Sequence, residues 1–432
     1  MKAAHKNEFP VPIASSAASG AACAVKRLRL SNFRNYGRLA LDLSAQVVVL
    51  SGANGAGKTN LLEAISFLSP GRGLRRARLR DVARKINRKT DRKAEPSSDP
   101  SGDPPGDFSG DAPLNKAEAG DAATDCATDW AVAATVQGPS GQVKLGSSLA
   151  RTERGTDRRL ARQDGENVSP ASLARAIGVQ WLTPQMDRLF LEGPSSRRRF
   201  LDRLVLGLDP DHGRRVAAYE RSLRERAKLL RVGGADPAWL SALEARMAAD
   251  GVAVAAARRE ALARLQRLLS DTAGAFPKAG LAIEGRIEGW LDDQPAVEVE
   301  SRFADMLAAN RRRDGEANVT CDGPHRSDLT VHHLDKDMPA ALCSTGEQKA
   351  LLIAVMLANA RAEAGRRGAA PILLLDEVAA HLDRQRRVAL FAEILALGGQ
   401  AWLSGTDHEL FEPLLGQAQF VSVDRGRATL ED

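Results

Sequence analysis

The segment that most constrains the fold of this chain joins an apolar run to a glycine-rich loop and then to a helical pattern. The run QVVVLSG occupies residues 46–52, and the sequence GANGAGKT spans residues 52–59. Leucine and isoleucine then recur at helical spacing in TNLLEAISFLS. Since a continuous apolar run is typical of a buried parallel strand, the segment predicts a strand, a tight loop and a helix in that order.

The loop sequence fits the pattern GxxxxGK[ST], which binds nucleotide phosphates when a strand precedes it and a helix follows. Its glycines let backbone N–H groups close around a β-phosphate, and Lys58 reaches the β- and γ-phosphates. Thr59 carries a hydroxyl that can ligate Mg²⁺. We therefore predict that ATP and Mg²⁺ bind here and that Lys58 is catalytic. The predicted ATP contacts of this loop are Gly52, Ala53, Asn54, Gly55, Ala56, Gly57, Lys58, Thr59 and Asn60.

A second apolar run, ILLLDE at residues 372–377, ends in two acids. Buried strands followed by aspartate are common, so this run indicates part of a nucleotide site only because the chain also has a phosphate loop. In that setting we predict that Asp376 holds Mg²⁺ through water and that Glu377 is the general base for the attacking water, which makes both residues catalytic. Asp383 ends the sequence VAAHLD and is either an ATP contact or only the cap of the next helix.

The sequence ALCSTGEQKA at residues 341–350 predicts a second helix start that can bind an anion. Ser344 is a favourable N-cap, and Glu347 suits a first helical turn. Gly346 permits close approach to the backbone. The phosphate loop lies far away in the sequence, so this helix start has no evident phosphate of its own.

The rest of the chain indicates an α/β fold with an inserted, mainly helical lobe. Alternating residues from 25 to 43 predict two strands, and strand and helix patterns return after residue 340, so we expect a mixed sheet with flanking helices, built from both chain ends. The predicted domains are a flexible tail at 1–24, an ATPase-lobe part at 25–194 with a disordered insertion at about 90–128, a helical lobe at 195–320 and the remaining ATPase-lobe part at 321–432.

Composition limits the setting and the partners. The net charge of +6 permits an anionic partner without requiring one. The four cysteines include no CxxC pair, which argues against a zinc or disulfide framework and fits a reduced, cytoplasmic setting. No apolar run reaches the ~18 residues that span a bilayer, so we expect no membrane association.

A basic run follows the first predicted helix, and a basic triplet opens the helical lobe. The predicted DNA-binding residues are Arg72, Arg75, Arg76, Arg78, Arg80, Arg197, Arg198 and Arg199. Charge runs usually form a solvated face, so these residues alone do not distinguish a DNA-binding surface from an ordinary one. No aromatic platform accompanies them, which favours tracking of a duplex backbone. If six arginines neutralise phosphates, log affinity falls with log salt at a slope of about −5.

The phosphate loop and the sequences STGEQK, LLLDE and HLD occur in the order found in ABC-type ATPases. Within that superfamily the chain resembles the RecF family of recombination-mediator ATPases, in the branch of DNA-repair and chromosome-structure proteins. The resemblance is carried by LRLSNFRNY, GKTNLLEAI, LTPQMD, GPSSRRRFLD, GPHRSD, STGEQKALLIA, LLLDEVAAHLD and SGTD, and it covers most of residues 25–430. It implies an ABC-type P-loop ATPase head.

The resemblance also implies an ATP-dependent, head-to-tail homodimer in which Ser344 and Gly346 contact the ATP of the partner subunit. Gln185 resembles the glutamine that links ATP and Mg²⁺ to the helical lobe. The alternative is that Gln185 is an ordinary polar loop residue. The family further implies slow, DNA-stimulated ATP hydrolysis that acts as a switch. Its partners would be double-stranded DNA or double-strand/single-strand junctions, RecR and, through RecR, RecO, with the task of loading recombinase onto gapped DNA.

Two alternatives share the core motifs. A nucleotide-binding subunit of an ABC transporter would have the same motif order, but the insert between the phosphate loop and STGEQK is long for such a subunit. A short-armed, SMC-like chromosome-structure protein would need helical arms, and residues 195–275 could form a hairpin of only ~60 Å at 1.5 Å per residue.

Overall fold

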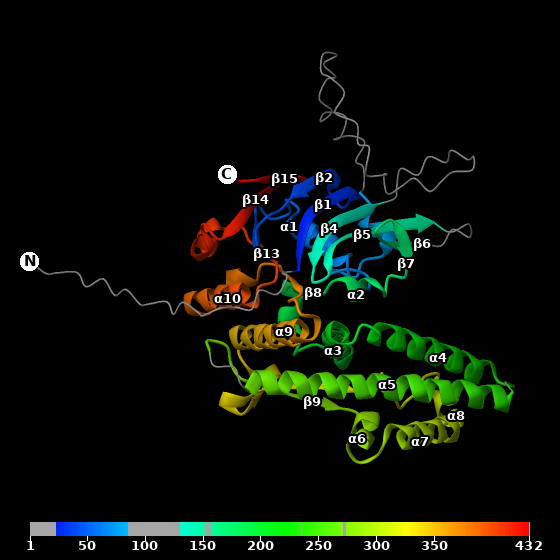
Figure 1. The fold of residues 1–432 in the computed structure, drawn as a ribbon. Coiled ribbons are helices and arrows are strands. Elements are labelled where there is room, and N and C mark those ends of the chain that lie inside the picture. Colours follow the sequence, from blue (N-terminus) through cyan, green and yellow to red (C-terminus); the bar gives the residue numbers. More distant parts are fainter. Residues whose placement is uncertain (1–22, 85–129, 152–156, 235, 271–273, 432) are drawn as a thin grey trace, which may run out of the picture.

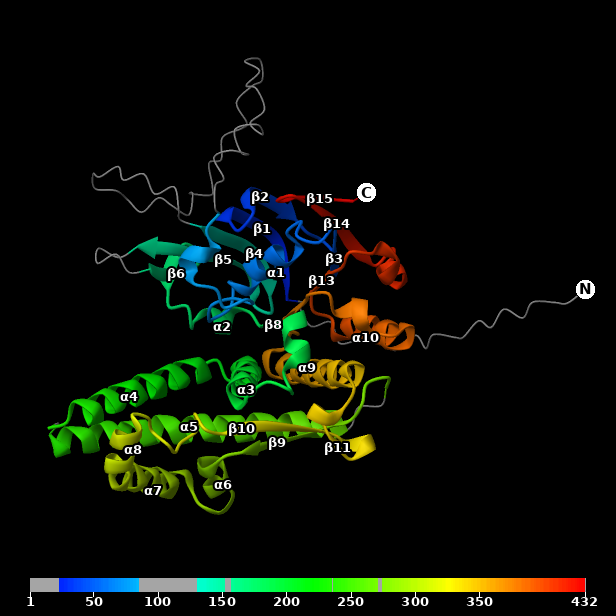
Figure 2. The same ribbon diagram turned by 180° about the vertical axis from the view of Figure 1, so that it is seen from behind.

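A computed structural model describes residues 23–84, 130–151, 157–234, 236–270 and 274–431. The predicted insertion at 90–128, and all but the last two residues of the predicted tail at 1–24, lie outside the described residues. Figures 1 and 2 show two sheets at one end of the molecule and a layer of long helices at the other.

The apolar run before the phosphate loop forms an inner strand of a six-stranded sheet, here called the central sheet, with the strand order β15-β14-β3-β13-β12-β8. Its members are β3 (Val47–Ser51), β8 (Val179–Leu182), β12 (Ile372–Leu375), β13 (Ala401–Ser404), β14 (Ala418–Asp424) and β15 (Arg427–Leu430). β3 pairs in parallel with β13 on one side and with β14 on the other. Both neighbours come from the end of the chain, which confirms a sheet built from both chain ends.

A second, antiparallel sheet has the strand order β2-β1-β4-β5-β6-β7. Its members are β1 (Ala24–Phe33), β2 (Tyr36–Asp42), β4 (Ala131–Gly138), β5 (Gly141–Arg151), β6 (Asp157–Gln163) and β7 (Glu166–Val168). Helix α1 (Lys58–Ser66) lies between this sheet and the central sheet (Figure 1). Leu61 of α1 shares one buried cluster with Leu28 of β1 and Val48 of β3, so the two sheets and the helix form one core.

Two helices, α9 (Thr345–Arg367) and α10 (Arg384–Leu397), cover the other face of the central sheet. Val47 and Val49 belong to the buried cluster of α9 and α10, whereas Val48 and Leu50 belong to the cluster of α1. Side chains alternate between the two faces of a strand, and both faces of β3 are covered. This arrangement explains why β3 reads as a continuous apolar run.

The middle of the chain forms the helical lobe, defined here as α3 to α8 with β9 to β11. Its helices are α3 (Pro194–Leu208), α4 (His212–Val232), α5 (Pro237–Ser270), α6 (Arg286–Asp293), α7 (Ala296–Ala309) and α8 (Arg311–Ala317). Leu262 and Leu265 of α5 share a buried cluster with Ile353 of α9, so α9 joins the central sheet to the helical lobe. Shorter helices are α2 (Leu173–Ala176), η1 (Leu79–Val82), η3 (Pro184–Arg188), η4 (Leu334–Lys336), η5 (Ala340–Leu342), η6 (Val378–His381) and η7 (His408–Leu414).

The helical lobe also holds a small sheet with the order β11-β10-β9. Its strands are β9 (Ala279–Glu284), β10 (Asp328–His333) and β11 (Met338–Pro339). β9 and β10 pair antiparallel, from Asp328 opposite Glu284 to His333 opposite Ala279. The predicted domain boundary at residue 321 therefore falls between two paired strands, because β10 extends the sheet of the lobe before the chain returns to the central sheet. The other predicted boundaries remain predictions.

Candidate nucleotide site

The phosphate loop connects β3 to α1 through glycines with positive φ angles. Gly52, Gly55 and Gly57 have φ angles of 142°, 80° and 127°, values that L side chains rarely adopt. A Cβ atom on Gly52 would lie 2.2 Å from the carbonyl oxygen of Val423, so the loop also approaches β14 too closely for any side chain. The required loop shape thus explains the glycines at these positions.

Asn35 and Tyr36, at the turn between β1 and β2, hold the loop from the side of the antiparallel sheet. Asn35 Nδ2 donates to the carbonyl oxygen of Ala56 over 2.8 Å, and Tyr36 Oη donates to that of Gly57 over 3.1 Å. Asn60 Nδ2 donates in turn to Asn35 Oδ1 over 2.7 Å. The sequence placed these residues only within a family motif, whereas the structure gives them a positioning role.

Lys58 is the first residue of α1, and its side chain turns back over the loop. Its residue surface is only 4% exposed, and Nζ donates to the carbonyl oxygens of Gly52 and Ala53 over 2.6 and 3.1 Å. Burial lowers the pKa of Lys58, while the nearby carboxylates of Glu377 and Asp376 act in the opposite direction. The cation therefore lies between the loop and the two predicted acids.

The carboxyl ends of three neighbouring strands bring the acids and the loop together. Asp376, directly after β12, accepts a hydrogen bond at Oδ1 from Thr59 Oγ1 over 2.9 Å and another from Ser404 Oγ over 2.7 Å. The backbone N–H of Glu377 donates to Ser404 Oγ over 2.9 Å. Glu377 itself has a φ of 52°. Ser404, at the end of β13, thus orients both acids, whereas the sequence placed it only within the family motif SGTD.

A cavity of about 100 Å³ opens where these groups meet. Its walls are Asn54, Gly55, Gly57, Lys58, Thr59, Asn60, Arg75 and Glu377. Arg75 was predicted as a DNA contact, but the structure places it on this wall, where Nη1 donates to Asn60 Oδ1 and lies 3.2 Å from Glu63 Oε2. Arg75 therefore lines the nucleotide cavity, and its contact with DNA remains a prediction.

Four predicted nucleotide contacts from outside the phosphate loop do not line this cavity: Gln185, Asp383, Ser344 and Gly346. Gln185 is exposed in η3, directly after β8, which is the neighbour of β12. Asp383 caps α10, since its side chain accepts from the backbone N–H of Arg386 over 2.8 Å. Ser344 caps α9 in a capping box with Glu347. Their contacts with ATP remain predictions.

The start of α9 is exposed, and its own side chains hydrogen-bond the backbone N–H groups there. Glu347 Oε2 accepts from the backbone N–H of Ser344 over 3.0 Å, and Lys336 pairs with the same carboxylate. The hydrogen bond from Lys336, followed by those from Ser344, lowers the pKa of Glu347 to about 2. A Cβ atom added to Gly346 would meet no atom within 4 Å, so this helix start faces open space.

Two of the predicted DNA contacts are engaged inside the protein. Arg197 pairs with Asp328 over 2.6 Å, and its side chain is 16% exposed. Arg198 Nη1 donates to the carbonyl oxygen of Ser327 over 2.7 Å. These contacts join α3 to the start of β10, and DNA binding by Arg197 and Arg198 remains a prediction.

The remaining predicted DNA contacts are exposed. They are Arg72, Arg76, Arg78, Arg80 and Arg199. Arg80 pairs with Asp157 over 2.7 Å. The other four form no ion pair with the described residues.

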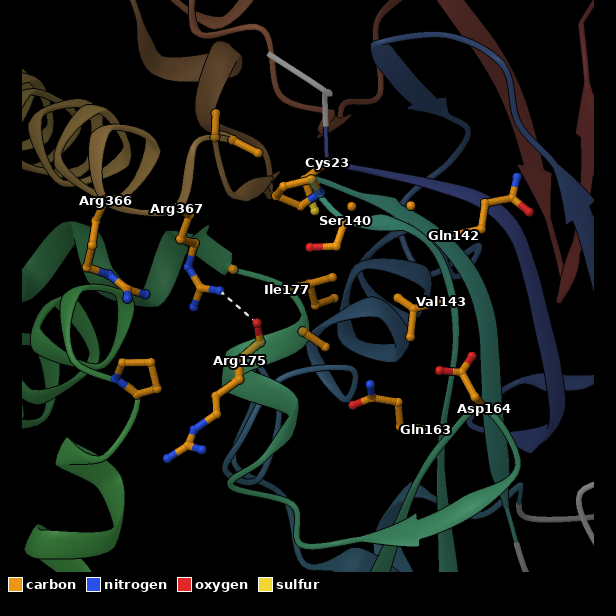
Figure 3. Close-up of a pocket in the computed structure, with 18 of the residues that line it drawn as sticks. Cys23, Ser140, Gln142, Val143, Gln163, Asp164, Arg175, Ile177, Arg366 and Arg367 are labelled. Carbon is orange, nitrogen blue, oxygen red and sulfur yellow. Dashed lines mark hydrogen bonds between the residues drawn. The ribbon is translucent and has the colours of Figure 1, made fainter.

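A larger cavity, of about 710 Å³, lies where the β4–β5 hairpin meets α2 and the end of α9 (Figure 3). Its arginines already have partners. Arg175 pairs with Asp211 over 3.0 Å, Arg366 donates to the carbonyl oxygen of Gly207, and Arg367 lies 2.7 Å from Glu363. None of the predicted site residues lines this cavity, so the smaller cavity at the phosphate loop is the candidate nucleotide site.

The chain is similar to known proteins over most of its length. A model described as "RecF/RecN/SMC N terminal domain" matches residues 24–98, which include the phosphate loop. The DNA replication and repair protein RecF of Mesorhizobium japonicum is 46% identical over 405 residues, covering 93% of this chain and 96% of that protein. The chain belongs to the RecF family. RecF of Rhizobium meliloti is also 46% identical, over 408 residues that cover 93% of this chain and 98% of that protein.

Further matches agree on the fold. A model described as "AAA domain, putative AbiEii toxin, Type IV TA system" matches residues 186–407, which contain the start of α9 and both acids. A solved structure of the recombination mediator protein RecF-ATPrS in the RecFOR pathway superposes with a TM-score of 0.75 at 19% identity, covering 96% of this chain and 100% of that chain. Membership in the RecF family favours an ABC-type head of this kind over the transporter and chromosome-structure alternatives.

No helix in the described ranges combines the length and apolar character needed to cross a bilayer.

Proposed function

We propose that this protein is an ATP-dependent, DNA-binding recombination mediator that acts in DNA repair and replication. The observation that carries the proposal is that Lys58, Thr59 and Glu377 line one cavity in a member of the RecF family, with Asp376 hydrogen-bonded to Thr59. Two of these groups come from the start of α1 and two directly follow β12. Their convergence is what ATP binding and hydrolysis require.

The chemistry follows from the groups on the cavity wall. The loop's backbone N–H groups and Lys58 bind the phosphates, and Glu377 accepts a proton from the attacking water as general base. The hydroxyl of Thr59 and the carboxylate of Asp376, 2.9 Å apart, are hard oxygen ligands that fit Mg²⁺. When bound, Mg²⁺ neutralises charge on the phosphates. Ser404 donates a hydrogen bond to Asp376 and accepts one from the backbone N–H of Glu377, and so holds both residues in position for these roles.

ATP would also join two copies of the chain. The start of α9 is an exposed anion-binding helix end, and Ser344 and Gly346 lie on it away from the chain's own cavity. In a head-to-tail homodimer these residues would complete the nucleotide site of the partner. Hydrolysis would then act as a slow switch that releases the dimer.

The DNA-related part of the proposal rests on the family and on the exposed arginines. The expected ligands are double-stranded DNA and double-strand/single-strand junctions, and the expected ATPase is weak and DNA-stimulated. RecR, and RecO through RecR, are the expected protein partners in loading recombinase onto gapped DNA. The setting is expected to be the cytoplasm.

Sedimentation of three variants with and without ATP tests the shared site. Lys58→Met should abolish ATP binding, whereas Ser344→Arg should preserve binding and prevent both dimers and hydrolysis. Glu377→Gln should accumulate an ATP-bound dimer, because binding survives and the general base is lost. A wild-type protein that stays monomeric with saturating ATP would rule out the shared site.

A further inference from the structure

The turn of the β10–β11 hairpin places a lysine beside the start of α9. His333 of β10 is paired with Met338 of β11, and Lys336 lies in η4 between them. Its Nζ forms an ion pair with Oε1 of Glu347, the third residue of α9. The hairpin belongs to the small sheet of the helical lobe, so this ion pair joins the helical lobe to the helix start that faces open space.

Two backbone N–H groups at this helix start already have acceptors within the chain. Glu347 Oε2 accepts from the N–H of Ser344 over 3.0 Å, and Ser344 Oγ accepts from the N–H of Glu347 over 3.4 Å. The N–H groups of Thr345 and Gly346 have no acceptor among the described residues. A phosphate of a partner subunit's ATP would therefore meet two free N–H groups, with the Glu347 carboxylate at the same helix end.

The charge of Glu347 decides whether this helix end attracts or repels a phosphate. A helix N-terminus carries about half a unit of positive charge, which the full negative charge of Glu347 outweighs. Lys336 adds a full positive charge and makes the balance positive again. The side chains of Lys336 and Glu347 are 51% and 19% exposed, so water screens their charges in a free chain. A second copy that covers the helix start removes this screening, and the balance of charge then matters more.

We propose that Lys336 is a positioning residue of the shared nucleotide site, which neutralises Glu347 so that the start of α9 accepts a phosphate of the partner subunit's ATP. The inference rests on the ATP-dependent homodimer proposed above and adds a residue that no sequence motif indicated. Lys336 acts through Glu347, because its Nζ is bound to that carboxylate, and it does not line the chain's own nucleotide cavity. Its loss should therefore weaken the joining of two copies and not the binding of ATP by one copy.

Sedimentation velocity of the full-length protein with saturating ATPγS measures the dissociation constant of the dimer. Lys336→Gln leaves the charge of Glu347 unopposed and should raise this constant at least about tenfold, because like charges brought together at an interface are costly. The matched control is Lys228→Gln, which removes the same charge from an exposed lysine of α4. The control should stay within about twofold of the wild type.

A second substitution distinguishes neutralisation from a structural role of the lysine. Glu347→Gln keeps a side-chain acceptor for the capping box and removes the negative charge. The double variant, with Lys336→Gln and Glu347→Gln, should therefore dimerise within about threefold of the wild type although the lysine is absent. The affinity for ATP, measured at protein concentrations too low for dimers, should be the same in all of these proteins.

The outcomes separate this inference from the shared site itself. If Lys336→Gln dimerises as well as Lys228→Gln, the charge of Glu347 needs no partner and the inference is overturned, whereas the shared site stands. If Lys336→Gln weakens the dimer and the double variant does not recover, the lysine holds the hairpin turn or contacts the partner directly, and its assignment as the neutralising residue is wrong. If the wild type stays monomeric with ATPγS, the inference and the shared site are both overturned.

Discussion

A single carboxylate oxygen, Oδ1 of Asp376, accepts hydrogen bonds from hydroxyl groups of two different elements. One donor is Thr59 of the phosphate loop and the other is Ser404 of β13. Ser404 also accepts from the backbone N–H of Glu377. The serine thus fixes the spacing of the two acids without needing to touch the nucleotide.

Ser404→Ala should therefore slow hydrolysis more than it weakens ATP binding. Loss of the hydroxyl leaves the Glu377 N–H without its acceptor and Asp376 with one donor fewer, at a cost of about 1–3 kcal/mol for a buried unsatisfied group. We expect kcat to fall at least tenfold with a Kd for ATP within about threefold of the wild type. Ser404→Thr keeps a hydroxyl and should restore most of the rate. Equal losses in kcat and in ATP affinity would show that Ser404 acts on the phosphate loop as a whole.

His325, in the loop before β10, is held between two groups of the helical lobe. Its Nε2 lies 2.9 Å from the carbonyl oxygen of Thr320 and must donate to it, so Nδ1 accepts from Tyr219 Oη over 2.7 Å. Burial is the main cause that lowers the pKa of His325. The histidine is therefore a neutral structural residue of the lobe.

The pH dependence of stability follows from this shift. The folded state binds the proton of His325 less readily than the unfolded state, so folding stability should fall as pH drops below about 6.5 and should be insensitive to this group above it. His325→Gln should flatten the curve between pH 7 and 5.5, by at most about 1.4 kcal/mol per pH unit. Denaturant unfolding at several pH values measures this. An identical pH slope in the variant would assign the dependence to other groups.

At the scale of elements, the β14–β15 hairpin is a wall of the phosphate loop. The backbone N–H of Gly426, at the hairpin turn, donates to the carbonyl oxygen of Ala56 over 3.3 Å. A Cβ atom on Gly426 would lie 2.3 Å from the carbonyl oxygen of Asn35. The hairpin and the β1–β2 turn therefore both contact the phosphate loop, through hydrogen bonds to the carbonyl oxygen of Ala56.

Gly426→Ala should loosen this wall and weaken ATP binding although Gly426 is not on the nucleotide cavity. Gly416→Ala is a matched control, because Gly416 has a φ of 76° against 81° for Gly426 and no atom within 4 Å of a built Cβ. Both changes cost about 1 kcal/mol of backbone strain, and only the first adds a clash. Titration of ATP against both variants should show a loss of at least fivefold for Gly426→Ala alone. Matching affinities would mean that the loop keeps its shape without the hairpin.

Local patterns in the sequence predicted the elements better than their pairing. The structure contains the two strands predicted between residues 25 and 43, as β1 and β2. It also contains the strand before the phosphate loop, as β3, and the helix that begins at STGEQK, as α9. β1 and β2 have alternating patterns, β3 is a continuous apolar run, and α9 has a capping residue at its start. The pairing of β9 with β10 did not follow, because no short-range pattern records contacts between strands that are distant in the sequence.

Some residues of the candidate site could be predicted from the sequence, and others could not. Lys58, Thr59, Asp376 and Glu377 could be predicted because their motifs have a fixed order and a strand context. Ser404 belongs to the motif SGTD, but its role could not be predicted, since a serine at a strand end is chemically ordinary until its neighbours are known. The arginines show a similar limit. Arg75 and Arg76 are neighbours in one basic run, yet only Arg75 lines the nucleotide cavity.

At the scale of the whole molecule, the central sheet ties distant parts of the chain into one unit. β3 lies between β13 and β14, so its amide hydrogens should exchange with solvent only when the C-terminal strands also open. Hydrogen exchange measured by mass spectrometry should show peptides of β3, β13 and β14 exchanging together and slowly. β7, which lies at the edge of the other sheet and is largely exposed, should exchange rapidly as an internal control. Faster exchange in β3 than in β13 would contradict this coupling.

The same interleaving has a consequence for synthesis of the protein on the ribosome. β3 is made early, and its two neighbouring strands are among the last to appear. At about 5–20 residues per second, the nascent chain spends on the order of tens of seconds with a largely apolar strand whose two edges are unpaired. Such an edge readily pairs with other chains. The growing polypeptide therefore needs shielding until its final strands emerge, and products of premature termination are expected to aggregate.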